Sequence, residues 1–225
     1  MTEKLVQKKK YDAVIFDLDG TLLNTLEDLR DSVNYGLSKY GMPKRSLEEI
    51  RHFVGNGVQR LLELAVPEGT PEEMLQKTFA AFKEYYAVHC NDKTDLYPGI
   101  KELLATLKEH GFLMAIVSNK LQEGVDALNV QYFKPYTELA IGAREGIRKK
   151  PAPDAVIEAL SRMHISKDRA VYVGDSEVDI ATAKNAGIPC ITVTWGFRTK
   201  AEQQAAGASL FVDVPGEIVP LLYEQ

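Results

Sequence analysis

The sequence predicts an α/β fold, in which a Rossmann-like parallel sheet is sandwiched by helices and a small all-helical cap domain is inserted after the first strand. Two patterns lead to this prediction. From residue 97 onward, strand-like and helix-like segments alternate, which is typical of parallel βαβ units. Residues 24–95 instead carry helical periodicity with no clear strand between the helices. We therefore expect an α/β catalytic core of residues 1–23 and 96–225 and a cap domain of residues 24–95.

The first strand is expected at residues 11–18, where a short β-branched apolar run ends in Asp-Gly. The helices of the cap follow from apolar residues spaced near the 3.6-residue period and from residues that commonly start or stop helices. Ser46 is an expected N-cap, and a polar stretch at residues 91–95 is expected to close the cap. The predicted cap helices are residues 25–40, 47–53, 58–65 and 71–89.

The remaining segments are expected to complete one sheet. Predicted strands are residues 113–117, 138–141, 170–173, 191–193 and 210–212. Predicted helices are residues 99–110, 121–128, 154–163, 177–186, 200–206 and 215–222, with Gly111 and Gly187 at helix C-caps. Ligands of open α/β sheets bind beyond the carboxyl ends of the strands, so the inserted cap should cover that edge.

The composition of the 225 residues, 45% apolar and 26% charged, is ordinary for a soluble globular protein. No apolar run approaches the roughly 18 residues of a membrane span. The first ten residues lack the apolar segment of a secretory signal, and Cys90 and Cys190 are consistent with a reducing compartment. We therefore expect a cytoplasmic protein with no membrane partner.

The charge balance disfavours nucleic-acid binding. The chain has 27 basic and 32 acidic residues, a net charge of −5, whereas such binding needs a concentrated basic surface. The lysine run at residues 8–10 is expected to be solvated, and the four histidines lack the spacing of a zinc site. We expect a monomer or a homodimer.

Asp17 and Asp19 follow the first strand and precede Gly20. Alternate residues of a strand share a face, so both carboxylates can point into one site while Gly20 permits a sharp turn. One carboxylate could attack phosphorus and the other move a proton, with a divalent cation offsetting the repulsion between anions. An ordinary strand-end turn or a fragment of a calcium loop has the same pattern.

Polar residues also follow three later strands. Ser118 and Asn119, expected at a helix start, could cradle phosphate or act as an N-cap. Lys150, or its neighbour Lys149, precedes a proline-stiffened loop and could be a fixed cation.

Asp175 comes directly after a strand, with Asp179 one helical turn later on the same face. Carboxylates at this edge suit Mg²⁺, although Asp175 could instead cap the helix.

Taken in order, these motifs resemble the haloacid dehalogenase-like superfamily of phosphatases, and the resemblance covers essentially the whole chain. It implies that Asp17 is the nucleophile and Asp19 the general acid and base. It also implies a Mg²⁺ cofactor held by the Asp17 carboxylate, the Asp19 carbonyl and Asp175, with Asp179 supporting Lys150 or a metal-bound water. The phosphate-binding residues would be Gly20, Ser118, Asn119 and Lys150.

Asp19 favours phosphate chemistry over dehalogenation, because an alkoxide leaving group needs a proton donor and a halide does not. Residues 53–58 and 195–198 look like those of phosphoglycolate phosphatases. Gly55 and Gly57 would equally suit a helix start, and Trp195 a core position.

The predicted function is Mg²⁺-dependent hydrolysis of a small phosphorylated metabolite, with 2-phosphoglycolate the leading candidate. The alternatives are a phosphosugar mutase, a pyrophosphatase and a catalytically silent metabolite-binding module. A carboxylate-bearing substrate wants a cation or an amide near its free end. Four cap residues could supply one: Arg51, His52, Asn56 and Arg60.

Overall fold

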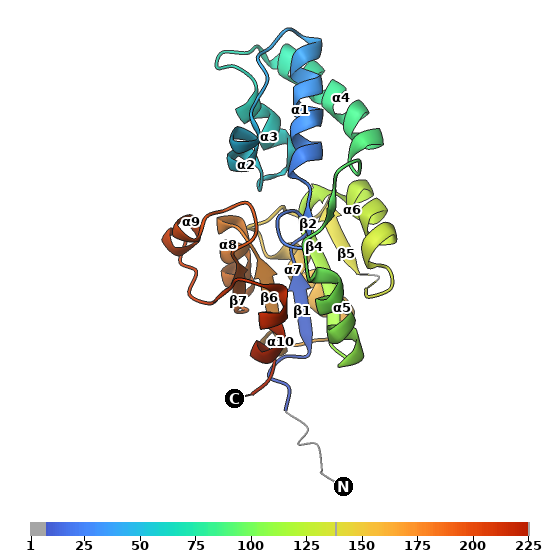
Figure 1. The fold of residues 1–225 in the computed structure, drawn as a ribbon, viewed down its shortest axis with the longest axis vertical. Helices are drawn as coiled ribbons and strands as arrows, with labels where there is room; N and C mark the ends of the chain where they lie inside the picture. Colours follow the sequence, from blue (N-terminus) through green and yellow to red (C-terminus); the bar gives the residue numbers. More distant parts are fainter. Residues whose placement is uncertain (1–7, 138, 225) are drawn as a thin grey trace.

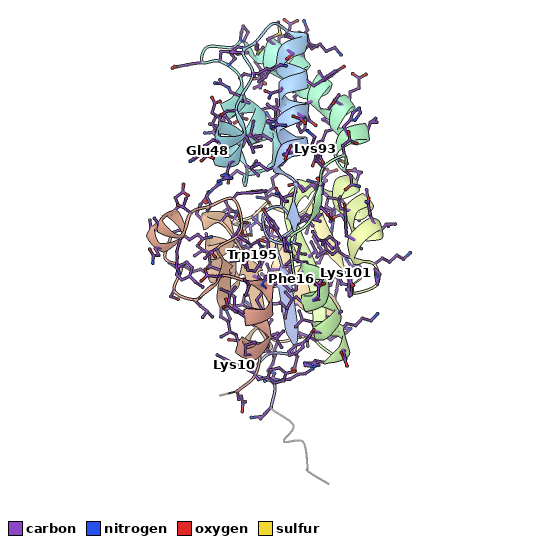
Figure 2. All side chains as sticks on the ribbon, in the orientation of Figure 1. Lys10, Phe16, Glu48, Lys93, Lys101 and Trp195 are labelled. Atoms are coloured by element: carbon purple, nitrogen blue, oxygen red, sulfur yellow. The ribbon has the colours of Figure 1, made fainter. Side chains whose placement is uncertain are left out.

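The computed structural model describes residues 8–137 and 139–224. Figure 1 shows two bodies stacked along the long axis, an α/β body and a helical cap of α1 to α4. Figure 2 places Phe16 within the α/β body and Lys93 where the two bodies meet. No helix within the described ranges combines the length and the apolar character that crossing a membrane requires.

One parallel sheet forms the centre of the α/β body. Its strand order is β5-β4-β1-β6-β7-β8, so β1 lies between β4 and β6. The bounds confirm the predicted strands, except that Glu138 lies outside the described residues and β4 continues four residues beyond its predicted end at Val117. The strands are β1 (Ala13–Phe16), β4 (Leu113–Leu121), β5 (Ala140–Ala143), β6 (Ala170–Gly174), β7 (Cys190–Val193) and β8 (Phe211–Val212).

Helices cover both faces of this sheet. Alternate residues of β1 point to opposite faces. Val14 and Phe16 pack with α5, α6 and α10, whereas Ala13 and Ile15 pack with α7 and α8. The helices are α5 (Ile100–Glu109), α6 (Gln122–Leu128), α7 (Asp154–Met163), α8 (Glu177–Ala186), α9 (Lys200–Ala205) and α10 (Ile218–Leu221). Short π or 3₁₀ turns occupy Asn129–Phe133, Lys167–Arg169 and Pro215–Glu217.

The helical cap has its own apolar core. Leu29, Val33 and Leu37 of α1 pack with residues of the other three cap helices. The predicted N-cap at Ser46 is confirmed, because Ser46 and Glu49 form a reciprocal capping box. The cap helices are α1 (Leu26–Lys39), α2 (Leu47–Phe53), α3 (Gly57–Ala65) and α4 (Glu72–His89), close to the predicted ranges.

Two very short strands join the bodies, and the sequence analysis missed them. β2 (Leu23–Asn24) pairs antiparallel with β3 (Asp95–Leu96). Two residues are too few to show the alternation that identifies a strand. The predicted domain boundaries at 23/24 and 95/96 fall inside this ribbon; the division itself stays a prediction.

Asp28 fixes the chain where it returns from the helical cap. The Asp28 carboxylate is buried on α1 and accepts hydrogen bonds from the Lys93 and Thr94 backbone N–H groups and from the Thr94 hydroxyl, at 2.8–3.1 Å. Asp28 therefore fastens the returning chain to α1 beside the two-residue ribbon of β2 and β3.

We expect Asp28→Ala to lower the free energy of unfolding by about 2–3 kcal/mol, because buried donors lose their acceptor. Urea denaturation measures this change. Asp31→Ala is the matched control: Asp31 lies on the same helix but pairs with the half-exposed Lys93 ammonium, so its loss should cost less than about 1 kcal/mol. Equal losses would contradict the anchoring role of Asp28.

Candidate active site

A small cavity of about 50 Å³ lies at the carboxyl ends of β1, β4 and β6, beneath the helical cap. The strand-end motifs converge on it, as the parallel sheet requires. The predicted site residues that line it are Asp17, Asp19, Ser118, Asn119, Lys150 and Asp175.

Lys150 is the cation at the centre of the site. Its ammonium group lies 2.6 Å from Asp17 Oδ1, 2.8 Å from Asp179 Oδ1 and 3.1 Å from the Tyr172 hydroxyl. These three acceptors match the three N–H donors of a lysine. The neighbouring Lys149 is exposed, so the geometry selects Lys150 from the two candidates.

Asn119 holds the Lys150 backbone in place. Its Oδ1 accepts from the Lys150 N–H at 2.8 Å, and its Nδ2 donates to the Lys150 carbonyl and to the Gly55 carbonyl, each at 3.0 Å. Both Nδ2 hydrogens are therefore engaged. The Asn119 side chain thus connects the Lys150 loop to the cap, and its predicted contact with phosphate stays a prediction.

Asp179 positions the Lys150 ammonium group and is less well suited to bind a metal ion. Besides Lys150 and Tyr172 on Oδ1, its Oδ2 accepts from the Ser176 N–H at 3.1 Å and the Ser176 hydroxyl at 2.6 Å. Ser176, not Asp175, is the N-cap of α8, so the capping alternative for Asp175 is wrong. With its oxygens occupied, Asp179 would have to give up bonds to bind a cation.

Asp175 is aimed at the cavity by its surroundings. The Phe197 N–H donates to Asp175 Oδ2 at 2.6 Å, and the Thr21 hydroxyl lies 3.3 Å from Oδ1. A Cβ added at Gly196 would lie 2.3 Å from the Asp175 Cβ, so only glycine leaves room there.

The sharp turn predicted at Gly20 is confirmed. Its φ of +92° suits glycine, and an added Cβ would lie 2.7 Å from an Asp175 carboxylate oxygen. Its N–H already donates to the Leu23 carbonyl at 2.9 Å. Gly20 therefore makes the turn and the close approach, and its N–H is not free to bind phosphate.

The clustered carboxyls favour a bound cation. One oxygen each of Asp17, Asp175 and Asp179 lie within 4.8 Å of one another. Burial and the Asp179 charge raise the pKa of Asp17 well above its usual value and that of Asp175 to about 7. A divalent cation between Asp17 and Asp175 would stabilise both ionised forms, so the donor set fits a hard cation with oxygen ligands.

Asp19 has its own cationic partner, Lys120, which the sequence analysis missed. Asp19 Oδ1 accepts from the Lys120 ammonium at 2.8 Å and the Thr25 hydroxyl at 2.7 Å. Burial opposes ionisation of Asp19, but these partners lower its pKa overall. The sequence feature that could have indicated Lys120 as a site residue is its position directly after the Ser118-Asn119 pair.

Ser118 reaches the cavity from a strand and not from a helix start. Because β4 extends to Leu121 and α6 begins at Gln122, the predicted phosphate cradle at a helix N-terminus is wrong. The register shift between β4 and β5 falls in this stretch. The Ser118 hydroxyl lies 3.4 Å from Asp19 Oδ2, facing the cavity.

The four cap residues expected to select substrate are not brought to the cavity. Asn56 lies in the turn between α2 and α3, and the other three lie on helix faces turned away from the cavity. The side chains are exposed or pair with acids of the cap: Arg51, His52, Asn56 and Arg60. The cap residues that do line the cavity are mainly apolar or glycine: Leu29, Val54, Gly55, Gly57, Val58 and Leu61.

Arg198 joins the α/β body to the cap beside the cavity. It is buried, pairs with Glu177 at 2.8 Å, and donates to the backbone carbonyls of Arg51 and Val54 at 2.8 and 2.7 Å. The adjacent Phe197 packs into the apolar core of the cap. The loop after β7 therefore reaches the site and fixes the α2–α3 turn above it.

Comparisons with known proteins cover nearly the whole chain. A family model described as haloacid dehalogenase-like hydrolase matches residues 14–193. Phosphoglycolate phosphatases of Pseudomonas putida and Nitrosococcus oceani are 32% and 31% identical, over 92% and 95% of this chain and 78% and 97% of theirs.

Solved structures agree in fold. A Lactobacillus delbrueckii crystal structure gives a TM-score of 0.91 at 35% identity, covering 96% of this chain and 100% of that one. A Haemophilus somnus structure, described as a predicted phosphoglycolate phosphatase, gives 0.88 at 26% identity, covering 94% and 98%. The similarity therefore spans the α/β body and the helical cap together.

We expect Gly196→Ala to weaken binding of a divalent cation about 10–100-fold, because the new methyl group displaces the Asp175 carboxylate. Isothermal titration calorimetry with Mg²⁺ measures this loss. Gly216→Ala is the matched control, since a Cβ there meets nothing within 4 Å. Unchanged cation binding in Gly196→Ala would contradict the assignment of Asp175 to the cation.

Proposed function

The chain belongs to the haloacid dehalogenase-like hydrolases and is a phosphatase, and from this premise we propose that it hydrolyses 2-phosphoglycolate to glycolate and phosphate with Mg²⁺. The observation that carries the proposal is the position of Asp17: it lines the cavity together with Asp19, is bonded to Lys150, and belongs to the acidic cluster. The names of the relatives support the choice of substrate.

In the first proposed step, a carboxylate oxygen of Asp17 attacks phosphorus and the bond to the ester oxygen breaks, leaving an aspartyl phosphate. Asp19 is ionised in the free protein, and it takes up a proton when the phosphate monoester binds as its monoanion. It gives this proton to the departing alkoxide, which is otherwise a poor leaving group. In the second step, Asp19 takes a proton from water as that water attacks phosphorus and releases the Asp17 carboxylate. The same residue thus acts as acid and then as base.

We assign binding of the transferring phosphoryl group to Lys150 and Ser118, which both line the cavity. All three N–H donors of Lys150 already have acceptors, so a phosphate oxygen would have to replace one of these acceptors. Lys150 supplies a fixed positive charge, which is worth more in a buried site than in water. Mg²⁺ would be held by the carboxylates of Asp17 and Asp175 with the Asp19 backbone carbonyl, and it would neutralise phosphate charge. Asp179 and Asn119 keep Lys150 in position by the bonds described above.

The cavity supports a small substrate. Its volume of about 50 Å³ leaves room for only a few water-sized groups. The cap residues above it exclude water, which strengthens the electrostatic interactions inside.

We also propose that the enzyme works in the cytoplasm, without a nucleic-acid or membrane partner, as a monomer or homodimer. The two free cysteines and the net charge of −5 support this setting.

The test is phosphate release from 2-phosphoglycolate, hexose phosphates, nucleotides and pyrophosphate, with Mg²⁺ and with a chelator. We expect 2-phosphoglycolate to be preferred, the chelator to abolish release, and Asp17→Asn to lower kcat at least ~10³-fold, because the amide is not a nucleophile. Transfer of phosphate between hexose positions would indicate a mutase. Preference for a nucleotide or pyrophosphate would contradict the substrate while leaving the reaction class intact.

A second prediction concerns the proton supplied by Asp19. For 2-phosphoglycolate, Asp19→Asn should lower kcat/KM about 10²–10⁴-fold, because the alkoxide leaves without its proton. For p-nitrophenyl phosphate under single-turnover conditions, formation of the aspartyl phosphate should be much less affected, since nitrophenolate leaves without help. Equal effects on both esters would show that Asp19 does not protonate the leaving group.

A further inference from the structure

Lys120 is a buried cation that no step of the proposed hydrolysis uses. It lies on β4 two residues after Ser118, its side chain is 4% exposed, and it lines the active-site cavity. Its ammonium group lies 2.8 Å from Asp19 Oδ1 and 5.1 Å from the centroid of the Tyr86 ring on cap helix α4. Burying an ammonium group costs free energy, which suggests that Lys120 has a function beside Asp19.

The cations that line the cavity differ in how many of their donors are engaged. Within the described ranges these cations are Lys150, Arg198 and Lys120. All three N–H donors of Lys150 have acceptors, and Arg198 donates to Glu177 and to two cap carbonyls. The hydrogen bonds of the described residues give Lys120 one acceptor, Asp19. The buried Tyr86 hydroxyl, which has no hydrogen-bond partner within the described residues, also lies beside this ammonium group and can take a second N–H. At least one N–H donor of Lys120 therefore remains for a ligand.

The position of Lys120 matches one end of the substrate. Asp19 must reach the ester oxygen in order to protonate it, so this oxygen lies next to the Asp19 carboxyl group. In the phosphate ester of a 2-hydroxy acid, a single carbon separates the ester oxygen from the carboxylate carbon. The carboxylate is therefore carried close to Asp19, where the Lys120 ammonium lies.

We propose that Lys120 binds the carboxylate of the substrate, and that the enzyme thereby selects phosphate esters of small hydroxy acids. This inference rests on the proposed function and extends it to the residue that determines specificity. The cap wall of the cavity is apolar, through Leu29, Val54 and Val58, and offers no competing charge. A charge-assisted bond in a buried site gives strong discrimination against substrates that lack the carboxylate.

Lys120→Met tests the proposal because it keeps most of the side-chain length and removes the charge. The substrates are 2-phosphoglycolate and ethyl phosphate, which resembles it without the carboxylate. We expect kcat/KM for 2-phosphoglycolate to fall at least about 30-fold more than kcat/KM for ethyl phosphate. An equal fall for both esters would show that Lys120 serves only to position Asp19, and would overturn the proposal.

Two further variants complete the design. Lys120→Arg keeps the charge and should restore a preference for 2-phosphoglycolate over ethyl phosphate. Lys83→Met removes an exposed lysine of α4 whose ammonium lies over the Phe79 ring, and it should leave both rates unchanged. A loss of preference in Lys120→Arg as complete as in Lys120→Met would contradict recognition by charge.

The wild-type enzyme gives a readout that does not depend on folding of a variant. It should prefer 2-phosphoglycolate to ethyl phosphate, and glycolate should inhibit it competitively where ethanol does not. Equal kcat/KM values for the two esters would overturn the role of Lys120 but leave the phosphatase activity intact. Failure to hydrolyse 2-phosphoglycolate at all would instead refute the proposed function.

Discussion

The constraint on which the rest of this structure depends is the clustering of four carboxylates, three of them buried, at one edge of a parallel sheet. Asp17, Asp175 and Asp179 are buried, and the Asp19 side chain beside them is 14% exposed. The buried lysines next to these carboxylates are Lys120 and Lys150. Four negative charges against two positive ones leave an excess that a low-dielectric site does not tolerate. A divalent cation would balance that excess. The excess negative charge is therefore unfavourable in the metal-free protein and favours binding of a metal ion, which can in turn bind phosphate.

Much of this arrangement could be predicted because each acid immediately follows a strand. Parallel strands bring their carboxyl ends to one edge, so Asp17 and Asp175 were expected at the same edge of the sheet. The structure makes them neighbours because β1 pairs directly with β6. Lys120 was missed because its position on β4 became clear only when the strand proved to continue to Leu121. The need for glycine at position 196 was hidden for a similar reason, since it depends on a contact with Asp175 that local sequence does not reveal.

For the cap, the helices could be predicted from the sequence, but the directions of the side chains could not. Periodicity and capping residues are local, so α1 to α4 follow from the sequence. The direction in which each cap residue faces depends on how the helices dock on the α/β body. Arg51 is an example: its side chain pairs within the cap, while its backbone carbonyl accepts the bond from Arg198 that helps fix the cap above the site.

The side-chain amide of Asn119 connects the cap, the α/β body and the loop that carries Lys150. Its Nδ2 holds the Gly55 carbonyl of the cap and the Lys150 carbonyl of the α/β body, while its Oδ1 holds the Lys150 N–H. A displacement of the Gly55 loop must therefore stretch a bond to the same side chain that positions the phosphate-binding lysine. Enclosure of the substrate and placement of the cation that binds its phosphate are in this way mechanically coupled, without any contact between the cap and Lys150 itself being required.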